Sequence, residues 1–212
     1  EAFAYYGHKS RLIWHKDRDL QNPDLVVLPG GFSYGDYLRC GALARFSPIV
    51  EEVMAFAKKG GLILGICNGF QILTECGLLP GTLLRNIGLD FICQHQYIRV
   101  EDNNTAFTHQ IPEGTVMDIP IAHKEGNYFC SDEILKELQD NHQIVFRYCD
   151  KQGNINAEYN PNGSRENIAG ICNRTRNILG MMPHPERAAT PYVTSNDGGK
   201  IFAALEEYFN LN

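Results

Sequence analysis

The sequence lacks the features that mark several large classes of protein. Among its 212 residues no apolar run approaches the roughly 20 residues that a membrane-spanning helix needs. Lys and Arg number 19 against 25 Asp and Glu, and no basic cluster offers a surface for nucleic acid. Residues 1–6 lack the charged and apolar regions of a secretory signal. We therefore expect a cytoplasmic protein with one domain over residues 1–212, a length that suffices for a full core.

Motifs for metals, disulfides and nucleotides are missing as well. The seven cysteines are odd in number and include no C-x-x-C pair, which argues against a disulfide framework or a zinc knuckle. The seven histidines include no H-x-x-x-H pair, so we predict no metal site. No G-x-x-x-x-G-K-S/T loop is present to hold nucleotide phosphates. We expect no cofactor in this chain and place any ATP chemistry elsewhere.

Apolar runs typical of strands alternate with amphipathic stretches typical of helices. This alternation predicts an α/β fold with an open, mostly parallel sheet and helices on both faces. Strands are predicted at 11–15, 25–28, 62–66, 91–100, 116–122, 143–148, 168–173 and 178–182. Helices are predicted at 46–59, 68–76, 131–140 and 198–209, with Ser131 as a cap. The strands at 91–100 and 116–122 are expected to form a small antiparallel extension.

A cysteine stands where the predicted strand 62–66 turns into the next helix. Gly65 and Gly69 leave room for a sharp reversal around Cys67. The thiol then lies at the positive end of the helix, which stabilises a thiolate. This is the arrangement of a nucleophile elbow, with sulfur in place of serine oxygen. A buried structural cysteine is the alternative, and Cys67 taken alone favours it.

A thiolate needs a base, a group that orients the base, and donors for the oxyanion. His184 and Glu186 lie two residues apart in a proline-restricted, extended segment, so their side chains point the same way. After the strand at 25–28, the N–H of Gly31 can join that of Asn68 in binding an oxyanion. A surface turn and an ordinary strand-ending turn are the alternatives. However, all three motifs follow predicted parallel strands, where open α/β sheets collect their ligands.

Taken together, the motifs resemble the class I (triad) glutamine amidotransferase family over nearly the whole chain. The stretches that carry the resemblance are PGGFSYGDYLR at 29–39, GICNGFQIL at 65–73, PIAH at 120–123 and MPHPER at 182–187. The resemblance implies a three-layer, flavodoxin-like sheet. The chain opens in what resembles the helix after the family's first strand, so we expect that strand to be absent.

The resemblance also implies roles for individual residues. By resemblance the triad is Cys67 as nucleophile, His184 as general acid and base, and Glu186 as its orienting partner. The implied oxyanion donors are Gly31 and Asn68, and the implied substrate-binding residues are Gly30, Phe32 and Gln71. His123 is a candidate for the mouth of the site, against the alternative of a solvated loop residue. Four further residues are expected either to order the loop and contact a partner or to pack locally: Tyr34, Asp36, Tyr37 and Arg39.

The activity that the resemblance implies is hydrolysis of L-glutamine to glutamate through a γ-glutamyl thioester on Cys67. The ammonia would pass to a separate synthetase subunit that uses ATP and Mg²⁺. There it would convert formylglycinamide ribonucleotide to formylglycinamidine ribonucleotide in purine biosynthesis, with a small third subunit as a further partner. Two alternatives remain open: a cysteine hydrolase or peptidase on the same scaffold, and a non-catalytic regulatory subunit.

Overall fold

The strands form a seven-stranded sheet and a separate two-stranded sheet in a computed structural model that describes residues 1–36 and 38–211. The strands are β1 Leu25–Leu28, β2 Leu62–Ile66, β3 Thr82–Leu84, β4 Ile92–Val100, β5 Val116–His123, β6 Asn127–Phe129, β7 Ile144–Tyr148, β8 Ile168–Cys172 and β9 Ile178–Met181. The α-helices are α1 Ala2–Tyr5, α2 Pro48–Lys58, α3 Asn68–Glu75, α4 Asp132–Asp140 and α5 Gly199–Leu211. Within the described ranges, no helix is long and apolar enough to cross a membrane.

The large sheet has a parallel part and an antiparallel part. Its strand order is β1-β2-β9-β8-β7-β4-β5. The first three strands are parallel to one another, and each later strand is antiparallel to its neighbour. The α/β fold class is therefore confirmed, although the antiparallel extension is larger than expected. The carboxyl ends of β1, β2, β9, β7 and β5 consequently lie at one edge.

The reversal from β2 into α3 depends on close packing that only glycine allows. All five residues of β2 are buried, because α3 packs against this strand and its neighbours. A Cβ at Gly69 would overlap the carbonyl oxygen of Leu28, and one at Gly65 would overlap the side chain of Leu73. Helix α3 therefore lies directly on β1 and β2, and it fixes the turn at Cys67.

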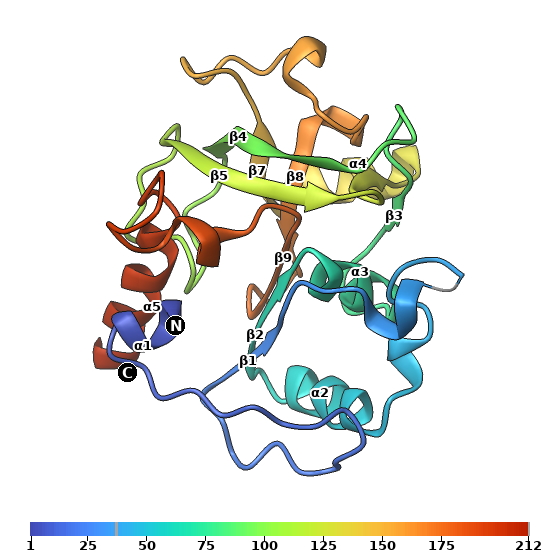
Figure 1. Cartoon of the computed structure of the whole chain (residues 1–212), viewed down its shortest axis with the longest axis vertical. Helices are drawn as coiled ribbons and strands as arrows, with labels where there is room; N and C mark the ends of the chain where they lie inside the picture. The colour runs from blue at the N-terminus through green and yellow to red at the C-terminus, as the bar shows by residue number, and fades with distance from the viewer. Residues whose placement is uncertain (37, 212) are drawn as a thin grey trace.

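The far end of the sheet curls back over the turn at Cys67. Figure 1 shows β4 and β5 crossing the molecule above β2 and β9. The N–H of His184 donates to the carbonyl of Pro120 in β5 at 2.8 Å, and Ala122 of the same strand contacts Cys67. Curling therefore brings the last strand of the sheet to the loops that follow β2 and β9.

Some sequence expectations are wrong and others are confirmed. Residues 11–15 form no strand: Leu12 is fully exposed, and an extended segment becomes a strand only beside a partner. Strands β3 and β6 were not expected from the sequence, because each is only three residues long; the two pair with each other. The cap at Ser131 is confirmed, since its side chain accepts the N–H of Ile134. Within the described residues, no strand precedes β1.

Candidate active site

Cys67 has an unusual backbone conformation at the start of α3. Its φ of 50° and ψ of −104° are sterically unfavourable for a residue with a side chain. The conformation is held on both sides, because the N–H of Cys67 donates to Met181 at 2.8 Å and its carbonyl accepts from Gln71 at 3.1 Å. The elbow therefore stores strain of the kind that collects at functional sites.

The thiol of Cys67 is buried and protonated at neutral pH. Its residue is 5% exposed, and Sγ donates to the carbonyl of Ala122 at 3.7 Å. Burial raises the pKa of the Cys67 thiol to about 12, and the backbone N–H of Asn68 opposes that shift. Because a thiolate is the nucleophilic form, this thiol needs a base close by.

His184 and Glu186 form the pair that can supply this base. The distance between Nδ1 of His184 and Oε1 of Glu186 is 2.6 Å. A carboxylate only accepts, so His184 donates its Nδ1–H and leaves the lone pair on Nε2. His184 is 2% exposed, and its Nε2 has no hydrogen-bond partner among the described residues. An unpaired basic nitrogen is thus held in a buried position.

Gly30 marks the point where the three predicted motifs meet. A Cβ at this position would lie 2.6 Å from Cε1 of His184 and 3.6 Å from Cβ of Cys67. Both side chains therefore lie around one small space beside the glycine backbone. No larger residue fits there without moving the imidazole.

The two expected oxyanion donors come from the loop after β1 and from the start of α3. A Cβ at Gly31 would meet nothing within 4 Å, so the backbone there faces open space. The backbone N–H of Asn68 lowers the pKa of the Cys67 thiol, although burial raises that pKa by more. Phe32 is 67% exposed, and its ring centroid lies 6.3 Å from that of Phe91. The ring of Phe32 thus lies at the side of the loop that follows β1.

Gln71 braces the elbow from within the protein. Its Oε1 accepts from Nδ2 of Asn68 at 2.8 Å, and its Nε2 donates to the carbonyl of Glu125 at 2.7 Å. The side chain is buried, with both ends of the amide engaged. In this structure Gln71 ties α3 to the turn between β5 and β6.

His123 does not lie at the mouth of the site. It ends β5 and is 3% exposed, with Nδ1 3.1 Å from Oδ1 of Asn86 and Nε2 3.5 Å from Nδ2 of Asn162. Burial and the nearby His184 lower the pKa of His123 to about 4, so the ring is neutral at pH 7. The expectation of a residue at the mouth is wrong because the curled β5 carries His123 inside.

The loop residues named from the sequence have local partners. The hydroxyl of Tyr34 lies 3.0 Å from the hydroxyl of Ser47, and Arg39 pairs with Glu75. Asp36 lies beside Cys40. Tyr37 lies outside the described residues. In the described part of the chain, no group of three or more His, Cys, Asp or Glu residues is arranged to hold a metal ion.

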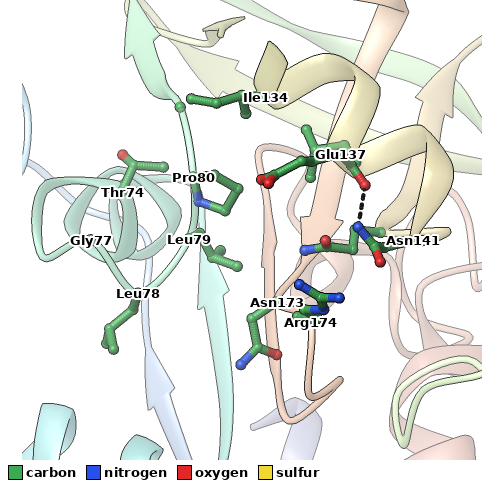
Figure 2. A pocket seen from close by; sticks show the side chains of 13 residues that line it. Thr74, Gly77, Leu78, Leu79, Pro80, Ile134, Glu137, Asn141, Asn173 and Arg174 are labelled. Atoms are coloured by element: carbon green, nitrogen blue, oxygen red, sulfur yellow. Dashed lines mark hydrogen bonds between the residues drawn. The ribbon is translucent and has the colours of Figure 1, made fainter. Parts of the chain in front are cut away.

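A cavity of about 410 Å³ lies at the other end of α3 from Cys67. Figure 2 shows its lining, which includes the end of α3, helix α4 and the turn before β9. A hydrogen bond of 2.7 Å joins Asn141 to the carbonyl of Glu137 at its rim. None of the site residues expected from the sequence lines this cavity. The described residues that line it include no cysteine and no histidine.

Two contributions, one from β5 and one from the turn after it, were not expected from the sequence. The carbonyl of Ala122 holds the resting thiol, and Glu125 bonds to both α3 and the loop after β1. The signal in the sequence was that residues 120–123, and the run that continues to residue 127, resemble the family. A backbone carbonyl leaves no residue-type signature, and the curl that brings it to Cys67 is a property of the whole sheet.

Comparisons with known proteins identify the family of this chain. A CobB/CobQ-like glutamine amidotransferase domain matches residues 4–209. The chain is 58% identical to phosphoribosylformylglycinamidine synthase subunit PurQ of Koribacter versatilis over 91% of this chain and 84% of the relative. It is 54% identical to the Gloeobacter violaceus subunit of that name, over 92% and 84%.

A solved structure, that of PurLQS from Thermotoga maritima, contains a similar chain. The two share 43% identity and superpose with a TM-score of 0.80, covering 91% of this chain and 83% of the other. Identity at this level over most of both chains shows common descent as well as a common fold. The chain therefore belongs to the glutamine amidotransferases, and within them to the family of phosphoribosylformylglycinamidine synthase PurQ subunits.

Proposed function

We propose that this chain is the glutaminase subunit of phosphoribosylformylglycinamidine synthase, with Cys67, His184 and Glu186 as its catalytic triad. One observation carries the assignment of the triad. A buried imidazole, oriented by a carboxylate at 2.6 Å, lies beside Gly30 together with a cysteine at a strained elbow, and its Nε2 has no partner among the described residues. The membership of the chain in the PurQ family supports glutamine as the substrate.

The proposed mechanism gives each residue a step. The Cys67 thiol turns from the Ala122 carbonyl and gives its proton to Nε2 of His184 as sulfur attacks the side-chain amide carbon of glutamine. The N–H groups of Gly31 and Asn68 hold the oxyanion that forms. His184 then protonates the leaving ammonia, which leaves a γ-glutamyl thioester on Cys67. A water molecule, deprotonated by His184, attacks this thioester and releases glutamate and the thiol.

The ammonia is used by a partner. A synthetase subunit of the PurL type would take it up and, with ATP and Mg²⁺, convert formylglycinamide ribonucleotide to formylglycinamidine ribonucleotide. A small subunit of the PurS type would complete the assembly, as the PurLQS structure of the Thermotoga relative supports. We place this complex in the cytoplasm, where this step of purine biosynthesis would take place.

The test is to replace Cys67 with alanine in the assembled complex. Cys67→Ala should abolish glutamine-dependent formation of formylglycinamidine ribonucleotide and leave ammonia-dependent formation at the wild-type rate. Cys93→Ala, which removes an exposed cysteine, serves as the matched control and should leave both rates unchanged. Retention of the glutamine-dependent rate in Cys67→Ala, or loss of both rates, would refute the proposal.

A further inference from the structure

The loop after β1 is fixed to the rest of the protein near its two ends. Near its start, Gly30 packs against His184 and Cys67. At its other end, a Cβ at Gly41 would lie 2.9 Å from the backbone nitrogen of Ile72, so the loop rests on α3 there. Between these points the described residues with positive φ are Tyr34, Gly35, Asp36 and Leu38. The position of the Gly31 N–H therefore depends on how firmly each end is held.

Glu125 binds both the end of this loop near Cys40 and helix α3. Its Oε2 accepts the backbone N–H of Cys40 at 3.0 Å, and its own carbonyl accepts from Nε2 of Gln71 at 2.7 Å. Its Oε1 lies 3.7 Å from Nε of Arg85, and the side chain is 12% exposed. One residue therefore joins the loop that carries Gly31 to the helix that begins at Asn68.

We propose that Glu125 is a positioning residue that sets the Gly31 N–H against the Asn68 N–H in the oxyanion hole. This inference rests on the proposed function of the same site. The two donors belong to different elements, and an oxyanion is bound well only when both point at the same place. Gln71, which donates to the carbonyl of Glu125, also accepts a hydrogen bond from Nδ2 of Asn68 at 2.8 Å. Glu125 is therefore linked to the Asn68 side chain through Gln71. The turn after β5 thereby aligns both halves of the hole.

The contact with Cys40 requires an acceptor at the right distance. In Glu125→Gln the amide oxygen still accepts the Cys40 N–H, so most of the activity should remain. Glu125→Ala removes the acceptor, and Glu125→Asp keeps the charge but shortens the arm. Because the oxyanion exists only during the reaction, loss of alignment should lower kcat and leave KM nearly unchanged.

The experiment measures glutamine hydrolysis by the assembled complex together with alkylation of Cys67 by iodoacetamide, a reaction that forms no oxyanion. Glu125→Ala should lower kcat about 10- to 100-fold, somewhat less than loss of an oxyanion donor, with KM and the alkylation rate within about 3-fold of wild type. Glu125→Gln should keep kcat within about 3-fold. Glu101→Gln, which removes a carboxylate that pairs with Arg99 and Arg147, should change nothing.

Three results would overturn the inference: wild-type kcat in Glu125→Ala, an equal loss in Glu125→Gln, or a parallel fall of kcat and alkylation. If Glu125→Ala does not fold, Glu125→Asp takes its place, with the same loss of kcat expected and the same result overturning it. Absence of glutamine hydrolysis in the wild-type complex would instead count against the proposed function.

Discussion

Two buried histidines lie at the same edge of the sheet with opposite environments. His184 donates to a carboxylate through Nδ1 and keeps Nε2 unpaired among the described residues. His123 has side-chain amides on both sides, from Asn86 and Asn162, and burial and His184 lower its pKa. One imidazole is prepared to exchange protons, and the other is held neutral.

The difference shows that the fold gives the reactive histidine, His184, another environment than the structural histidine, His123. An unpaired buried polar atom costs about 1 to 3 kcal/mol, and catalysis is one reason why a protein keeps such an atom. Nε2 of His184 and Oε2 of Glu186 have no partner among the described residues, and the His184 ring lies beside Gly30 together with the strained Cys67. Around His123, by contrast, the Asn86 amide is engaged through both its oxygen and its nitrogen. At this edge of the sheet, polar atoms without a described partner belong to His184 and Glu186, near the strained Cys67, and the polar atoms around His123 are hydrogen-bonded.

The largest expected effect comes from exchanging each histidine for glutamine. His184→Gln should lower kcat for glutamine hydrolysis in the complex by about 10² to 10⁴, because general acid and base catalysis is lost. His123→Gln should lower it less than about 10-fold, since this ring moves no proton in the reaction. Steady-state kinetics of the two variants decide the matter. A comparable loss in both would erase the distinction between the histidines.

The next effect tests the space between Cys67 and His184. Gly30→Ala places a methyl group 2.6 Å from Cε1 of His184, and the displaced ring should cost about 10² in kcat. Gly31→Ala adds the same group where nothing lies within 4 Å and keeps the N–H, so its loss should be at least several-fold smaller. The comparison requires kcat of both complexes. An equal loss in the two variants contradicts the convergence at Gly30.

The dependence of the unfolding free energy on acid pH should reveal the buried, neutral state of His123. The pKa of His123 is lowered from 6.5 to about 4, so at pH values between these the unfolded chain binds a proton that the folded chain does not. Its stabilising contribution is complete above pH 6.5 and is lost as the pH falls toward 4, by about 2 to 3 kcal/mol. His123→Gln should therefore show a flatter decline in unfolding free energy between pH 7 and pH 4. An unchanged slope in denaturant titrations argues against a buried neutral ring.

The smallest expected effect concerns the packing around His123. A Cβ at Gly126 would overlap the imidazole of His123, so Gly126→Ala should destabilise the fold by about 1 to 2 kcal/mol. Gly88→Ala is the control, because its Cβ would meet only Oδ2 of Asp90, at 4.0 Å. Urea denaturation of both variants measures the difference. Equal stability would mean that the turn after β5 tolerates a shift of the ring.

The sequence predicted those parts of the site that depend on local patterns. The apolar run at 62–66 and the glycines around Cys67 specify a strand, a reversal and a helix within a few residues. The segment 11–15 also contains an apolar run, from Leu12 to Trp14, but a strand needs a neighbouring strand as well, and none lies beside it in the described residues. The environment of His123 could not be predicted, because its partners lie 37 and 39 residues away in the chain.

The most direct test of the account is labelling of the complex with the diazo-ketone analogue of glutamine, followed by peptide mass spectrometry. We expect modification of Cys67 alone among the seven cysteines, slowed at least about 10²-fold by His184→Gln and little changed by His123→Gln. Modification of another cysteine, or equal slowing by the two histidine variants, would contradict the central claim that His184 activates Cys67.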